Sequence, residues 1–250
     1  MIGLALGDAV LPADPHAAYY APAQGLDGQA LRAALHGIIR GHVRHSYSEV
    51  WEILEEADED PDNPDNVIDF YSGRSIAKAD RDRGGNTPDA WNREHLWAKS
   101  HGFPGESQHA FTDAHHLRAA DKSVNADRGD LDFDEGGQAH NECTACRFDA
   151  DSWDPGPSRR GDVARVLLYM DLRYDGSDSG TPDLELVDHT TSIGERHLGH
   201  LCTLLVWHEE DPVDEAESRR NDVIFAWQGN RNPFIDHPEW VQSIWGDGCQ

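Results

Sequence analysis

The spacing of apolar residues along the chain predicts a protein built mostly of α-helices. In several segments, apolar residues recur every three or four positions, which places them on one face of a helix. The predicted helices cover residues 31–43, 50–54, 163–170, 198–206, 214–228 and 240–245. Ser46 and Ser48 offer N-caps for the second helix, which we expect to pack against the first.

Polar and irregular sequence occupies the middle of the chain. Residues 67–71 have the apolar pattern of a short strand, whereas residues 80–89 and 130–157 contain many polar residues, Gly and Pro, and predict loops. The segment 91–125 between these loops is rich in His, Trp and charged residues. Because rigid scaffolds commonly hold reactive loops in place, we expect the chemistry of the protein here. The predicted fold class is α+β, mostly helical with a small central sheet.

No internal repeat or linker divides the chain, and its 250 residues are an ordinary length for one domain. We predict a single domain over residues 29–250, preceded by an N-terminal extension over residues 1–28 that is flexible or the remnant of a signal peptide. No Lys or Arg precedes the apolar stretch of this extension, so a complete signal peptide is not visible. The longest apolar run, 163–170, contains Arg165 and is shorter than the roughly 20 residues of a membrane span, so we expect no membrane partner.

The chain is strongly acidic. It has 21 Lys and Arg against 47 Asp and Glu, a formal net charge of −26, which argues against the broad basic surface of most nucleic-acid-binding proteins. A local basic cleft stays compatible with this composition. Lysine occurs only as Lys78, Lys99 and Lys122, and such an acidic, Lys-poor surface predicts solubility in concentrated salt and a fold that NaCl stabilises.

The cysteines leave several interpretations open. His140, Cys143 and Cys146 follow one another at zinc-like spacing, but a structural Zn²⁺ site needs four ligands and the sequence offers no partner pair. The alternatives are a disulfide between Cys143 and Cys146, or three residues that are not coupled to one another. With Cys202 and Cys249 the chain has four cysteines, which are too few for a disulfide scaffold of this length.

Candidate chemistry centres on Glu94, His95 and Asn125. If their segment is extended, the adjacent side chains of Glu94 and His95 point to different sides, so Glu94 could bind a metal while His95 acts on a substrate. Asp121 or Ser123 starts a predicted helix that carries Asn125 in its first turn. A carboxylate and an amide oxygen suit Mg²⁺, which keeps several waters and takes few protein ligands. Mn²⁺ and Ca²⁺ are alternatives.

Three motifs follow one another along the same segment. They are Asn92-Arg93-Glu94-His95, Asp113-Ala114-His115-His116-Leu117-Arg118 and Ser123-Val124-Asn125-Ala126-Asp127-Arg128-Gly129. Together they resemble the bacterial endonuclease I family of non-specific nucleases, which belongs to the His-Me finger (ββα-metal) nucleases. Family-like sequence also occurs at residues 161–165, 201–205, 228–234 and 236–240, so the resemblance covers roughly residues 31–245. Several motifs in the same order are more specific than any one of them.

The resemblance implies a metal-dependent, largely sequence-independent endonuclease that acts on DNA and also on RNA. His95 would be the general base that activates water, and Glu94 and Asn125 would ligate one divalent ion within a finger of two strands and one helix. The implied products carry 5′-phosphate and 3′-hydroxyl ends. Members of the family are periplasmic or secreted, so the resemblance also implies export, and we expect a monomer.

Four further residues are candidates for supporting roles. Arg118 and Arg128 flank the predicted helix, and either guanidinium could clamp the phosphate, because it matches phosphate oxygens bidentately. The alternative is that both are surface residues that pair with some of the many carboxylates. His115 and His116 are expected to support the metal ligands or to pack, rather than to bind the metal. Some family members have an arginine between the first two motifs, and this chain has none between Glu94 and His116.

A non-catalytic binding protein is the rival interpretation, in which the metal-stabilised finger serves only as a scaffold. The presence of Glu94, His95 and Asn125 together favours an enzyme, because a scaffold has no physical need for that base beside those ligands.

Overall fold

The structure is a computed structural model that describes residues 15–85, 87, 89–246 and 248–249. The described residues form eight α-helices and several short strands, which confirms the predicted α+β class. The helices are α1 (Gly28–Ile39), α2 (Val50–Ala57), α3 (Lys122–Arg128), α4 (Arg160–Arg173), α5 (Leu201–Glu210), α6 (Glu215–Gln228), α7 (Pro233–Asp236) and α8 (Trp240–Trp245). Three short 3₁₀ helices cover Ala21–Ala23, Lys78–Asp80 and His109–Thr112.

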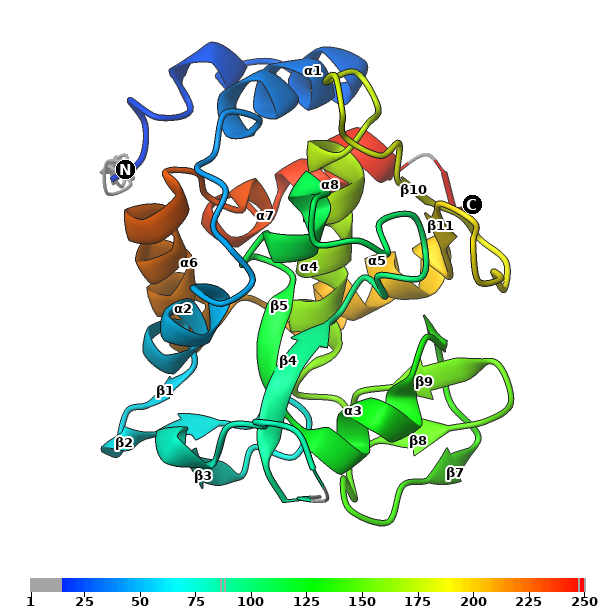
Figure 1. Cartoon of the computed structure of the whole chain (residues 1–250). Helices are drawn as coiled ribbons and strands as arrows, with labels where there is room; N and C mark the ends of the chain where they lie inside the picture. The colour runs from blue at the N-terminus through cyan, green and yellow to red at the C-terminus, as the bar shows by residue number, and fades with distance from the viewer. Residues whose placement is uncertain (1–14, 86, 88, 247, 250) are drawn as a thin grey trace, which may run out of the picture.

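Helix α4 is the centre of the helical part. It is buried from Gly161 to Arg173, and α1, α5 and α7 pack around it (Figure 1). Helix α1 packs mainly on α4 and α8, whereas α2 packs on α6, so the expected packing of the first two helices on each other is wrong. The connection over residues 40–49 carries the chain from one helical layer to the other (Figure 1).

The strands divide into four small sheets. They are β1 (Glu59–Asp60), β2 (Asn63–Ile68) and β3 (Ser75–Ala77); β4 (Trp91–His95) and β5 (Leu117–Asp121); β6 (Asp132–Phe133), β9 (Ser152–Asp154), β8 (Arg147–Phe148) and β7 (Gln138–Ala139); and β10 (Glu185–Leu186) and β11 (His197–Leu198). The third of these sheets lies in the segment 130–157 that was predicted as a loop. Strands of two or three residues are too short for an alternating pattern to reveal them.

The two-stranded sheet and α3 form one unit. Strands β4 and β5 are antiparallel, with Glu94 opposite Arg118 and His95 opposite Leu117. Helix α3 begins at Lys122, directly after β5 ends. The side chain of Asp121 caps it by accepting hydrogen bonds from the backbone N–H groups of Ser123 and Val124. The predicted order of strand, strand and helix is therefore present.

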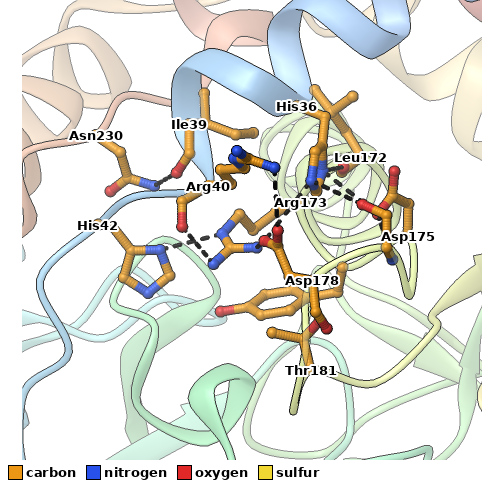
Figure 2. Close-up of polar contacts among 12 residues, drawn as sticks. His36, Ile39, Arg40, His42, Leu172, Arg173, Asp175, Asp178, Thr181 and Asn230 are labelled. Atoms are coloured by element: carbon orange, nitrogen blue, oxygen red, sulfur yellow. Dashed lines mark hydrogen bonds and ion pairs between the residues drawn. The ribbon is translucent and has the colours of Figure 1, made fainter.

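The C-terminal end of α4 is tied to the segment that follows α1. Arg173 donates hydrogen bonds to Nδ1 of His42 at 3.2 Å, to the carbonyl oxygen of Arg40 at 2.7 Å and to Asp178 at 3.0 Å (Figure 2). Asn230 donates to the carbonyl oxygen of Ile39 at 3.2 Å. These contacts fix the start of the connection that leads to Tyr47.

The N-terminal extension is partly folded. Tyr20 is fully buried, and its hydroxyl donates to Asp236 at 2.6 Å. Residues 15–27 pack on α1 and α8, while residues 1–14 lie outside the described part. Among the described residues, no helix combines the length and the apolar character needed to cross a membrane.

Candidate active site

A pocket of about 530 Å³ lies along β4 and contains the three central candidate residues. Glu94 and His95 reach it from β4, and Asn125 reaches it from α3. Its lining residues are Tyr47, Trp51, Asp82, Asn92, Arg93, Glu94, His95, Ala98, Lys99, Ser100, Asn125, Gly129 and Asp130. The structure thus brings together the three residues at the centre of the sequence prediction.

Glu94 is held in place through one carboxylate oxygen. Its Oε1 accepts hydrogen bonds from the hydroxyl of Tyr71 at 2.7 Å and from Arg128 at 3.1 Å. Its Oε2 takes part in neither of these bonds. Burial raises the pKa of Glu94, although Arg128 opposes this shift. A cation at Oε2 would favour the ionised carboxylate.

Asn125 presents an amide oxygen to the same pocket. Its Nδ2 donates to Oδ1 of Asn92 at 2.7 Å, which leaves Oδ1 of Asn125 as the unengaged atom of the amide. Oε2 of Glu94 and Oδ1 of Asn125 are hard oxygen donors, and Mg²⁺ commonly takes one or two protein ligands with waters completing its shell. The donor set therefore fits such an ion. No group of three or more His, Cys, Asp or Glu residues able to hold a metal occurs in the described part of the chain.

His95 is oriented as a base. Its Nε2 lies 3.0 Å from the carbonyl oxygen of Phe111, which can only accept a hydrogen bond, so Nε2 carries the proton and Nδ1 carries the lone pair. The imidazole lies 4.8 Å from the ring of Phe111 and 5.3 Å from that of His116, measured between ring centres. Burial, together with His116, lowers the pKa of His95 well below its ordinary value, so the ring is neutral at pH 7.

Arg93 and Lys99 are the cationic residues of this pocket. The guanidinium of Arg93 lies 3.3 Å from the ring centre of Tyr47 and 4.1 Å from that of Trp51, and it donates to the carbonyl oxygen of Tyr47. Sequence reasoning missed Arg93, although it lies in the first motif and alternation along a strand places it on the same face as His95. Arg93, Glu94 and His95 all line the pocket.

The structure corrects the predicted roles of the two other arginines. Arg128 is fully buried and donates to Glu94 and to the carbonyl oxygens of His95 and Leu96, at 3.0 and 2.8 Å for the last two. It therefore holds a proposed metal ligand instead of reaching a phosphate in the pocket. Arg118 is 6% exposed and lines a different pocket. Neither is a surface residue, but each forms an ion pair with a carboxylate, Arg128 with Glu94 at 3.1 Å and Arg118 with Asp58 at 3.7 Å.

The two adjacent histidines have separate surroundings. Nε2 of His116 lies 2.7 Å from the carbonyl oxygen of Ala110, and its ring packs beside that of His95. His115 lies farther away, with Nε2 at 3.1 Å from the carbonyl oxygen of Asn230 and its ring against Tyr169. Neither residue lines the pocket, and His116 is the one that contacts a candidate catalytic residue.

The open question about the cysteines is settled in favour of a disulfide. Cys143 and Cys146 are bonded to each other, and Cys202 is bonded to Cys249, so no thiolate is available for Zn²⁺. Nδ1 of His140 accepts a hydrogen bond from the backbone N–H of Cys143 at 3.0 Å. His140 therefore supports the disulfide turn.

The buried histidines predict a loss of stability in acid. Burial lowers the pKa of both His115 and His116 to about 4, whereas in the unfolded chain it is about 6.5. Since the unfolded state takes up these protons first, their contribution is fully present above about pH 6.5 and is lost as the pH falls towards 4. We expect the free energy of unfolding to fall by about 2–3 kcal/mol per histidine between pH 7 and 4.5. Urea denaturation followed by tryptophan fluorescence measures this, and equal stability at both pH values would contradict it.

Comparison with known proteins adds a family and named relatives. The endonuclease I family matches residues 27–239. Two proteins named extracellular ribonuclease, from Bacillus amyloliquefaciens and Bacillus subtilis (strain 168), are each 51% identical to this chain, over 94% of its length and 81% of theirs. A protein named extracellular deoxyribonuclease, from Aeromonas hydrophila, is 27% identical over 67% of this chain and 70% of its own length.

Proposed function

Because the chain belongs to the endonuclease I family, we propose that it is a metal-dependent endonuclease that hydrolyses phosphodiester bonds in RNA and DNA without base specificity. The observation that carries this proposal is the neutral His95, with its Nδ1 lone pair unengaged, in one pocket with Glu94, Asn125 and Arg93. A scaffold without catalytic activity would not need this base, so the arrangement favours the enzyme over a binding protein.

Different residues of the pocket have different roles in the proposed reaction. Glu94 and Asn125 would hold Mg²⁺, which when bound supplies a Lewis acid for the charge on the scissile phosphate and the leaving oxygen. His95 takes a proton at Nδ1 from the attacking water, and the water oxygen forms the new bond to phosphorus. The P–O3′ bond breaks, and the 3′ oxygen takes its proton from solvent. The products carry 5′-phosphate and 3′-hydroxyl ends.

Both nucleic acids are proposed as substrates because water, and not the 2′-hydroxyl of the sugar, is the nucleophile. The relatives at 51% identity carry the name ribonuclease, and the more distant relative carries the name deoxyribonuclease. We therefore expect RNA cleavage with 5′-phosphate ends. A ribonuclease that uses the 2′-hydroxyl would leave 2′,3′-cyclic phosphates instead.

The experiment combines two substrates with end analysis. Purified protein is incubated with end-labelled RNA and with supercoiled plasmid, in Mg²⁺ and in EDTA. We expect cleavage of both substrates in Mg²⁺ only. The products should carry 5′-phosphate groups, which a phosphatase removes. Cleavage in EDTA, or cyclic phosphate ends on RNA, would contradict the mechanism, and absence of cleavage by the folded protein would favour the binding protein.

Arg93 is expected to bind the scissile phosphate. Its guanidinium is fixed between two aromatic rings, so little side-chain freedom is lost when a phosphate binds. We expect Arg93→Met to lower kcat/KM by about 100-fold, as the loss of a transition-state contact does. Arg83→Met, at an exposed arginine outside the pocket, is the control and should leave kcat/KM unchanged. Equal activity of Arg93→Met and the wild type would exclude this role.

Export is the last part of the proposal. Disulfides persist in oxidising compartments, and this chain contains Cys143–Cys146 and Cys202–Cys249. The names of the Bacillus relatives describe extracellular proteins. Both facts support an enzyme that acts outside the cytoplasm.

A further inference from the structure

A second pocket, of about 410 Å³, lies where β1, β2, α4 and α6 approach β5. It shares no lining residue with the candidate active site. Four arginines and five acidic residues line it, and we call it the arginine pocket. The arginines are Arg118, Arg159, Arg219 and Arg220, and the acidic residues are Asp58, Glu59, Asp162, Glu215 and Glu217. Pro61 and Ala216 at its rim are exposed, so it is open to solvent.

Arg118 is an unusual residue of this pocket. Its side chain is 6% exposed, yet it donates no hydrogen bond to any described residue, and its Nε is wholly buried without a partner. Its nearest carboxylate oxygen, Oδ1 of Asp58, is 3.7 Å away. The part of the guanidinium that lines the pocket therefore has donors that can take an acceptor from outside the chain.

The carboxylates around Arg118 are engaged by other groups. Asp58 accepts hydrogen bonds from Arg220 and from the backbone N–H of Ala119, each at 2.8 Å. Asp162 accepts from Arg159 at 3.4 Å, and Glu217 accepts from Arg165 at 2.8 Å. Burial and the neighbouring charge of Arg220 lower the pKa of Arg118 to about 10. Three carboxylates thus lie around Arg118, and each accepts its hydrogen bonds from another group.

We propose that the arginine pocket binds a terminal phosphate group at Arg118. A phosphate offers two oxygens to the parallel N–H groups of one guanidinium, which fits the unengaged donors of Arg118. The ring of Phe70 lies near two of the arginines. Its centre is 4.9 Å from the guanidinium of Arg118 and 5.5 Å from that of Arg159. The depth of Arg118 favours a free or terminal phosphate over a phosphodiester within a strand. A nucleoside 5′-monophosphate and inorganic phosphate both carry such a group. Phosphate binding itself is independent of the proposed function, and only the choice of a nucleotide as the ligand rests on it.

Thermal unfolding of the metal-free protein tests the site. We expect inorganic phosphate, at about 100 times its Kd, to raise the Tm of the wild type by about 5 °C at constant ionic strength. The same rise is expected in His95→Ala and Arg93→Met, which alter only the candidate active site. Arg118→Met should lose the rise. No rise in the wild type, or an equal rise in Arg118→Met, would overturn the proposal.

Further measurements of Tm distinguish the ligands, and a second variant controls for misfolding of Arg118→Met. Adenosine 5′-monophosphate should raise Tm and adenosine should not; a rise with adenosine would overturn recognition of the phosphate. An equal rise with sodium chloride would overturn selectivity for an oxyanion.

Ala216→Glu adds a carboxylate at the exposed rim in the first turn of α6, where Glu is tolerated, and should weaken phosphate binding at least about tenfold. Unchanged affinity in this variant would count against the site. Since no turnover is measured, a failed nuclease assay leaves these results interpretable.

Discussion

His95→Ala is expected to lower kcat/KM for RNA and plasmid cleavage by about 1,000-fold, because it removes the general base. Nε2 of His95 is engaged by the carbonyl oxygen of Phe111, so Nδ1 alone is available to take the proton from water. The matched control is His189→Ala, at an exposed histidine outside the pocket, which should cleave like the wild type. Isothermal titration with Mg²⁺ should give unchanged affinity in His95→Ala, since the proposed ligands remain.

The pH dependence gives a second measure of the same residue. Burial and His116 lower the pKa of His95 well below its ordinary value of 6.5, so the base is unprotonated throughout the neutral range. The kcat/KM of the wild type is therefore expected to stay level from pH 8 to 6.5 and to fall only in more acidic solution. A loss of half the activity near pH 6.5 would indicate an ordinary histidine, and full activity of His95→Ala would refute the base.

Arg128→Met is expected to lower the free energy of unfolding by about 3–5 kcal/mol, which corresponds to a fall in Tm of about 10 °C. The substitution leaves Glu94 buried without its ion pair, and it removes hydrogen bonds to the carbonyl oxygens of His95 and Leu96. We also expect weaker Mg²⁺ binding, since the carboxylate of Glu94 loses one of the groups that hold it. Urea denaturation and metal titration measure the two effects.

Arg118→Met is the matched control for this experiment. Both arginines are buried and both belong to the same unit of β4, β5 and α3, but Arg118 donates no hydrogen bond to a described residue. In phosphate-free buffer, its replacement should therefore change the free energy of unfolding little. Equal destabilisation by the two substitutions would show that burial alone, and not the bonds to Glu94 and β4, explains the effect of Arg128.

The sequence predicted the features that depend on neighbouring residues. Asp121 caps α3 through backbone groups two and three positions away, so the helix start and the place of Asn125 followed from local spacing. The long helices followed from their apolar faces, and the motif order indicated the strand of His95. Each of these signals lies within a few residues of the feature that it predicts.

The roles of the arginines could not be predicted in the same way. Arg128 binds groups on β4 that lie more than thirty positions away in the chain, and the isolation of Arg118 depends on how Asp58, Arg220 and Ala119 meet. Arg93 is held in the pocket by Tyr47 and Trp51, which lie far earlier in the chain than β4. Such features follow from the packing of distant segments, which local patterns do not contain.

The direct passage from β5 into α3 limits how the chain length can vary. One residue inserted between Asp121 and Asn125 would turn Asn125 by about 100° around the helix axis and carry its amide away from Glu94. The connection between β4 and β5 reaches the surface at Glu106 and Ser107, which are exposed and do not line the pocket. Insertions are therefore expected to be tolerated at this surface turn, whereas the strand-to-helix junction admits none.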